Sequence, residues 1–169
     1  MLAAVPALVA GWTDWRWRRI PNWLTMPALL LGIGFNCFAA GWPGAKESLL
    51  GAGLGLGLLL PFVLIRSLGA GDWKLAGALG AFLGPSRMIT VLLGTVLVAG
   101  LMAVVVIVWK KRVGRTLRNL AHLMAALFTL HLPGPEVSLD NPESSKIPFG
   151  VAMAVAVVLY TVGQAWGIV

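Results

Sequence analysis

Charged side chains and cysteine are scarce in this sequence. Of its 169 residues, six are acidic, 11% carry a charge of either sign, and Cys37 is the one cysteine. A single cysteine excludes a disulfide framework and a Cys-x-x-Cys metal site. So few charges do not cover the surface of a water-soluble domain, which argues against a soluble globular protein.

Apolar residues are abundant instead. They make up 59% of the chain and give it a mean hydropathy of +0.88, which is typical of an integral membrane protein. No stretch is polar enough to form a separate soluble domain, so the sequence predicts one all-α, membrane-embedded domain over residues 1–169. The net charge of +7 comes from short basic clusters at the ends of apolar runs, a pattern that indicates membrane topology. We therefore expect the lipid bilayer, and no nucleic acid, as a partner.

The apolar runs can be divided into membrane helices. Crossing the hydrocarbon core takes about 20 helical residues. The sequence predicts a polytopic membrane protein with six transmembrane helices, over residues 2–15, 22–40, 48–68, 72–84, 88–109 and 147–169. Residues 116–132 have a polar first half, which favours an interfacial helix within a cytoplasmic loop of residues 110–146; a further membrane crossing is the alternative.

The basic residues predict the orientation of these helices. With the N-terminus outside, eleven of the thirteen lysines and arginines fall on the cytoplasmic side, and only Lys46 and Arg87 remain outside. Positive charge accumulates on the cytoplasmic side of membrane proteins. We therefore expect a multi-pass protein of the cell inner (cytoplasmic) membrane.

Two aspartates fall on the cytoplasmic side in this topology. Asp14 follows the first predicted helix, and Asp72 begins the fourth. Because a charge within hydrocarbon costs roughly 2.5–3.5 kcal/mol, an ionisable residue near membrane depth suggests a function. Two neighbouring carboxyl groups can share one proton, so that one activates water while the other donates to a carbonyl oxygen. Helix dipoles favour Asp72 as the base and Asp14 as the proton carrier.

Each aspartate also has a purely structural interpretation. In this interpretation Asp72 is simply the N-cap of a helix, because aspartate accepts hydrogen bonds from the first free amides. Asp14 is then simply a salt-bridge partner of Arg16, Arg18 or Arg19, which follow it closely. These alternatives remain open from the residues alone.

Three motifs occur in order along the chain. They are Asp14-x-Arg-x-x-x-Ile20-Pro21-Asn22-x-Leu24-Thr25, Gly69-x-Gly71-Asp72-x-Lys74-Leu75 and Lys146-Ile147-Pro148-Phe149-Gly150. Together they resemble the type IV prepilin peptidase family of Gly-x-Gly-Asp membrane aspartic proteases. The short chain is similar to the branch that includes peptidases of tight-adherence (Flp) pili and archaeal preflagellin peptidases.

This resemblance implies a membrane aspartic endopeptidase with Asp14 and Asp72 as its catalytic pair. Its substrate would be a prepilin or pseudopilin precursor, cut at the cytoplasmic membrane face between a short basic leader and an apolar helix. Longer members carry a cysteine-bearing cytoplasmic domain, which this chain lacks. We therefore expect no metal and no other cofactor.

Five further residues are candidates for substrate binding. Gly69 and Gly71 lack a Cβ, so they let the backbone bend and approach a substrate chain, unless they form an ordinary loop. Lys74 contacts substrate or tunes Asp72 in one interpretation, and extends to the interface as a topology anchor in the other. Pro148 and Phe149 either line the site or only begin the last helix.

Two other functions compete with proteolysis. A non-catalytic assembly factor of a pilus or secretion system could keep every motif for structural reasons, so that only an activity measurement separates it from a peptidase. A small transporter usually places its ionisable groups near the bilayer midplane and has repeated halves. Here both aspartates are predicted at one face, which favours the peptidase.

Overall fold

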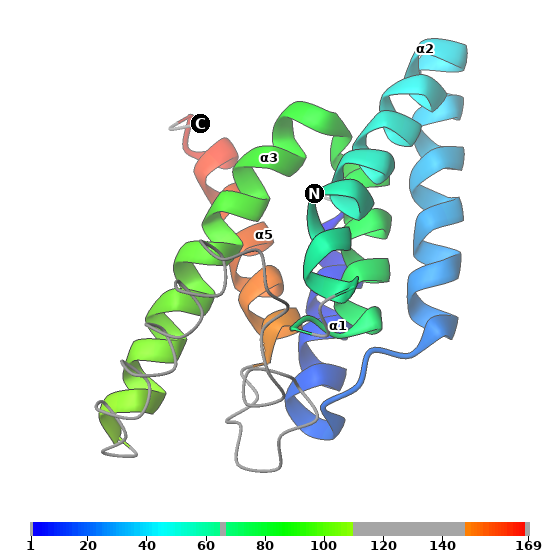
Figure 1. The fold of residues 1–169 in the computed structure, drawn as a ribbon. Helices are drawn as coiled ribbons and strands as arrows, with labels where there is room; N and C mark the ends of the chain where they lie inside the picture. The colour runs from blue at the N-terminus through cyan, green and yellow to red at the C-terminus, as the bar shows by residue number, and fades with distance from the viewer. Residues whose placement is uncertain (1, 65–66, 110–147, 168–169) are drawn as a thin grey trace, which may run out of the picture.

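The computed structural model describes residues 2–64, 67–109 and 148–167 (Figure 1). The elements in this part of the chain are helices: α1 (Ala4–Trp17), α2 (Asn22–Leu64), α3 (Ala70–Trp109) and α5 (Phe149–Ala165). The prediction of an all-α protein is therefore confirmed. The predicted loop 110–146, with its interfacial helix 116–132, lies outside the described residues.

The prediction of six transmembrane helices is wrong. The described chain forms four helices, and two of them, α2 and α3, are long and apolar enough to cross a membrane. With 14 and 17 residues, α1 and α5 are shorter than the about 20 residues that a crossing usually takes. The predicted breaks after residue 40 and near residue 84 are bends within α2 and α3, not loops.

A single glycine makes each bend. Gly41 has φ 62° and ψ −146°, and Gly84 has φ 74° and ψ 172°. Residues with a Cβ rarely adopt this conformation. Pro43 and Pro85 follow, and proline is tolerated in the first turn of a helical segment because the amide there has no helical partner. Glycine and proline, which usually indicate loops, here mark bends.

The bend in α2 brings its two limbs, 22–40 and 42–64, side by side (Figure 1). The Asn36 side-chain amide donates to Ser48 Oγ across the two limbs, at 2.8 Å. The second limb of α2 also packs closely against α3. A Cβ on Gly51 of α2 would collide with the carbonyl oxygen of Gly80 in α3. Glycine therefore lets the backbones of α2 and α3 touch.

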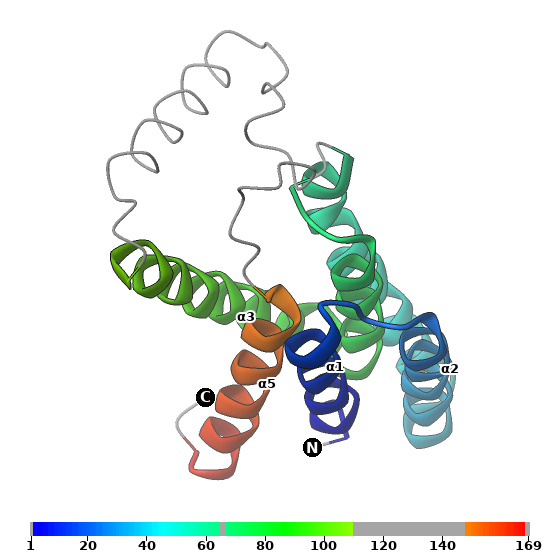
Figure 2. The same cartoon turned by 90° about the horizontal axis from the view of Figure 1, so that it is seen from below.

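A hydrophobic core joins α1, α3 and α5. Its fully buried members include Leu75, Leu79, Met88, Met153 and Val157. Helices α1 and α5 lie side by side, with α3 next to α5 (Figure 2). This packing brings the end of α1, the start of α3 and the start of α5 together.

Candidate active site

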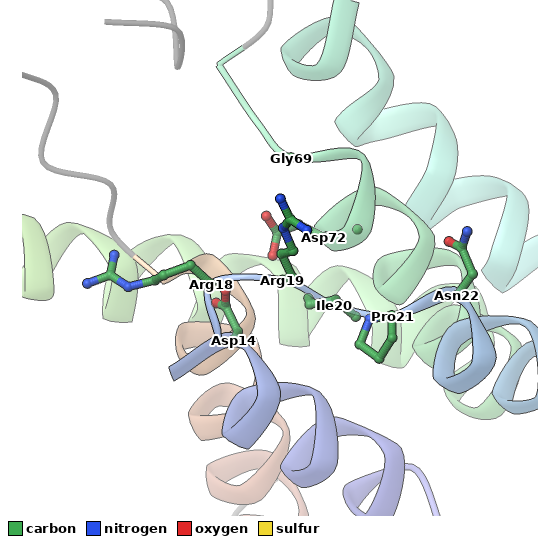
Figure 3. A pocket seen from close by; sticks show the side chains of 9 residues that line it. Asp14, Arg18, Arg19, Ile20, Pro21, Asn22, Gly69 and Asp72 are labelled. Carbon is green, nitrogen blue, oxygen red and sulfur yellow. The ribbon is translucent and has the colours of Figure 1, made fainter. Parts of the chain in front are cut away.

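A pocket of about 380 Å³ lies where α1 ends and α3 begins (Figure 3). Its residues come from the last turn of α1, from the linker to α2 and from the first turn of α3. They are Asp14, Arg18, Arg19, Ile20, Pro21, Asn22, Gly69, Gly71 and Asp72. Both candidate aspartates therefore line the same pocket.

Asp14 is held by the first turn of α5. Only 7% of Asp14 is exposed, and its Oδ2 accepts a hydrogen bond from the Gly150 amide at 2.9 Å. This approach requires glycine, because a Cβ on Gly150 would lie 3.0 Å from Asp14 Oδ2. Helix α1 is not a candidate membrane span. Burial raises the pKa of Asp14, while the amides of Gly150 and Val151 and the charge of Arg18 act in the opposite direction.

The linker after Asp14 turns sharply into the pocket. Arg18 ends α1 with φ 53°, and its amide donates to the Asp14 carbonyl oxygen at 2.9 Å. Pro21 has no backbone N–H to donate to a helical hydrogen bond, and it favours an extended conformation for Ile20 before it. Helix α2 then begins at Asn22. The linker 18–21 therefore forms one wall of the pocket.

Asp72 lies in the first turn of α3, two residues after its first residue. It is therefore not the N-cap of that helix. Among the described residues, the buried Asp72 Oδ1 has no hydrogen-bond partner. The other oxygen, Oδ2, lies close to Gly69, where a Cβ would be 2.9 Å from it. The simple capping interpretation does not explain an unpartnered buried oxygen.

Asp14 and Asp72 line the same pocket (Figure 3), and their carboxyl groups interact electrostatically. Because two nearby like charges repel, the fully ionised pair is disfavoured and the state with one proton on the pair is stabilised. One carboxylate can then accept a proton while the other carboxyl group donates one.

Three of the predicted binding residues, Lys74, Pro148 and Phe149, do not line this pocket. The Lys74 ammonium group donates to Asn22 Oδ1 at 2.9 Å, and so ties α3 to the start of α2. Pro148 precedes α5, and Phe149 packs against the hydrophobic core. By contrast, Gly69 and Gly71 do line the pocket. Neither has a positive φ, so the missing Cβ provides space rather than an unusual backbone conformation.

Gly150 and Ile20 are contact residues that sequence reasoning did not select. Both occur in the motifs, and this was the available signal. The sequence does not show that the Gly150 amide faces a carboxylate 136 positions away. It also does not show that Ile20 lies against Gly71. Such contacts depend on the packing of α5 and the linker.

The described residues contain no group of three or more His, Cys, Asp or Glu side chains that could hold a metal ion. Cys37 is exposed on α2. The charged side chains that line the pocket are those of Asp14, Asp72, Arg18 and Arg19.

Fold and pocket define an all-helical membrane protein with a carboxyl pair at one end of its helices. A family model described as the type IV leader peptidase family matches residues 1–105, which is more than half of the chain, and the protein belongs to this family. Neither the curated proteins nor the solved structures contain a match. The predicted family is thus confirmed, and membership implies a protease that acts on prepilin-like proteins. The matched residues include Asp14 and Asp72 and end before α5.

Proposed function

We propose that this protein is a membrane aspartic endopeptidase that removes the leader peptide from prepilin or pseudopilin precursors. Asp14 and Asp72 are its catalytic pair in this proposal. The observation that carries it is their shared pocket, which joins two helices of a chain that belongs to a leader peptidase family. Water activation by a carboxyl pair requires no metal or other cofactor.

The contacts of the two carboxyl groups support different roles for them. Asp14 accepts the Gly150 amide and lies near the charge of Arg18, and both interactions stabilise its ionised form. Asp72 Oδ1 has no such partner. Leaving a buried charged oxygen unpaired costs roughly 1–3 kcal/mol or more, whereas a helix dipole contributes about 0.3–1 kcal/mol. These contacts favour Asp14 as the base and Asp72 as the proton carrier, the reverse of the assignment from helix dipoles.

Peptide hydrolysis then follows from one proton on the pair. Ionised Asp14 takes a proton from water while the water oxygen attacks the scissile carbonyl carbon, and Asp72 donates its proton to the carbonyl oxygen. A neutral tetrahedral diol results. The carbon–nitrogen bond breaks as Asp14 gives its proton to the leaving nitrogen and Asp72 recovers a proton from a diol hydroxyl group. The products are a free carboxyl group and a new amino terminus, and the pair regains its starting state.

An apolar groove of about 510 Å³ between α1 and α5 supports a position for the substrate helix. It is lined by Leu8, Gly11, Trp12, Trp15, Val151, Ala154, Val155, Val158 and Leu159. Trp15 follows Asp14 in the chain, and Val151 follows Gly150, so the groove ends beside the catalytic pair. In this proposal the apolar helix of the precursor lies in the groove, and the leader enters the polar pocket.

The basic residues around the pocket support a cytoplasmic location for it. Arg16, Arg18 and Arg19 follow Asp14 closely, and Lys74 follows Asp72. Positive charge marks the cytoplasmic end of membrane helices. We therefore place the pocket at the cytoplasmic face of the inner membrane.

Co-expression with an epitope-tagged prepilin tests the proposed activity. We expect Asp14→Asn and Asp72→Asn to leave the precursor uncleaved, with at least about a hundredfold loss of rate, because acid–base catalysis contributes roughly 10²–10⁴-fold. Glu47→Gln is the matched control, since Glu47 is exposed and does not line the pocket. Cleavage is measured as a mobility shift on immunoblots. Normal cleavage by both aspartate variants would contradict the proposal.

A further inference from the structure

Ile20 lies in the pocket wall (Figure 3), and it approaches glycines of two different helices. A Cβ built on Gly71 in α3 would lie 3.1 Å from Ile20 Cβ. A Cβ built on Gly150 in α5 would lie 2.9 Å from Ile20 Cδ1. One end of the isoleucine side chain therefore touches α3, and the other end touches α5.

Each of these glycines adjoins one carboxyl group. Gly71 directly precedes Asp72, and the Gly150 amide donates to Asp14 Oδ2 at 2.9 Å. Ile20 thus separates the two backbone positions that hold the catalytic pair. Isoleucine suits such a role because its branched Cβ restricts rotation of the side chain. The side chain also packs against the hydrophobic core, which further limits its movement.

The linker that carries Ile20 is tied down on both sides. Before it, the Arg18 amide bonds the Asp14 carbonyl oxygen at 2.9 Å. After it, Asn22 Oδ1 accepts a hydrogen bond from Lys74 at 2.9 Å. The position of Ile20 is therefore fixed relative to α1 and to α3, the two helices that carry the aspartates.

We propose that Ile20 is a positioning residue that sets the separation of the two carboxyl groups. The inference rests on the proposed aspartic peptidase activity. Separation determines how strongly the two groups repel, and therefore the width of the pH range in which the pair holds one proton. It also determines whether water and carbonyl oxygen can be reached at the same time, and a misplacement of about 1 Å can reduce the rate roughly a hundredfold.

Ile20→Ala and Ile20→Val test this role in purified protein with a synthetic precursor peptide. Ile20→Ala removes the atoms that reach Gly150, so we expect kcat to fall about tenfold to a hundredfold with little change in KM. We also expect the bell-shaped pH profile of kcat/KM to change in width. Ile20→Val keeps the branched Cβ that faces Gly71 and loses only Cδ1, so its kcat and pH profile should lie between those of Ile20→Ala and the wild type.

Leu92→Ala is the matched control, because Leu92 is a buried core residue of α3 that does not line the pocket. It should lower the melting temperature and leave kcat and the width of the pH profile unchanged. Among the described residues, the charged groups that line the pocket with the pair are Arg18 and Arg19 from the linker, and both remain in every variant. Residues 148–167 of α5 and its flanks carry no charge. A changed profile width therefore reports on the carboxyl pair.

Two outcomes separate this inference from the proposed activity. If Asp14→Asn and Asp72→Asn are inactive but Ile20→Ala keeps the wild-type kcat and pH profile, Ile20 does not position the pair. If the aspartate variants remain active, the proposed function itself fails. Should Ile20→Ala not fold, Ile20→Val decides, and a wild-type kcat and pH profile for it would overturn the inference.

Discussion

Buried polar groups differ between two regions of the molecule, the pocket at the start of α3 and the contact of Asn36 and Ser48 with α3. At the pocket, Asp72 Oδ1 is buried without a hydrogen-bond partner. Fourteen residues along α2 from Asn22, or roughly 21 Å on a straight helix, Asn36 donates to Ser48 Oγ at 2.8 Å and to the Ala81 carbonyl oxygen at 2.9 Å. Ser48 in turn donates to the Ala81 carbonyl oxygen at 2.7 Å.

This difference separates polar groups that stabilise the fold from those available for chemistry. A buried polar group that forms its hydrogen bonds contributes to stability, and removing one of its partners destabilises the protein. A buried polar group without a partner does not stabilise the free protein, so it remains available to a ligand. The Asn36–Ser48 network therefore serves to join α2 and α3, while Asp72 Oδ1 is free to take part in the proposed reaction.

The largest contrast is expected between glycines at and away from the pocket. Gly150→Ala adds a Cβ 2.9 Å from Ile20 Cδ1 and 3.0 Å from Asp14 Oδ2, so the side chains of Ile20 and Asp14 must give way. We expect kcat to fall about tenfold to a hundredfold. Gly53→Ala is the control, because a Cβ there has no neighbour within 4 Å. Peptide cleavage assays on both variants decide, and equal activities would remove Gly150 from the site.

A second contrast concerns stability. Ser48→Ala removes a fully buried hydroxyl group and leaves Asn36 with fewer partners, so the free energy of unfolding should fall by about 1–3 kcal/mol without loss of kcat. Asp72→Asn, whose Oδ1 has no partner to lose, should keep or raise the melting temperature. Thermal unfolding in detergent measures both. A large destabilisation by Asp72→Asn would mean that Asp72 serves the fold.

The smallest effect is a slope in the pH dependence of stability. Burial raises the pKa of Asp14 above its ordinary value of 3.8. Between pH 3.8 and this raised pKa, the folded protein therefore binds more protons than the unfolded chain. Stability from this group is therefore highest at low pH and decreases as the pH rises through that window. Asp14→Asn should remove this decrease, and melting temperatures measured from below pH 3.8 upward test it. An unchanged slope would exclude Asp14 as its source.

Sequence reasoning recovered the parts of this site that depend on chain order. Asp14 and Asp72 were predicted on one side, and they line one pocket. The helix count failed because Gly41-Trp42-Pro43 and Gly84-Pro85 are common loop signals, and nothing local distinguishes a loop from a bend.

The contacts of Ile20 and Gly150 could not be predicted for a different reason. They arise where the linker, α3 and α5 meet, and a residue's own neighbours in sequence do not specify such a meeting. The proposed exchange of base and proton carrier also rests on such contacts. Helix ends are visible in a sequence, whereas the Gly150 amide at Asp14 and the unpartnered oxygen of Asp72 depend on tertiary packing.

The left-handed turn at Arg18 has a consequence for the energy balance of the active end. Among the described residues, Arg18 is the one non-glycine residue with a positive φ. A side chain in this conformation costs roughly 1–2 kcal/mol, which glycine would avoid. Yet the arginine places its positive charge where it favours ionised Asp14. The end of α1 thus retains local backbone strain together with a charge that favours the proposed base. Glycine, the residue that would relieve the strain at this position, would not supply the charge that assists the proposed reaction.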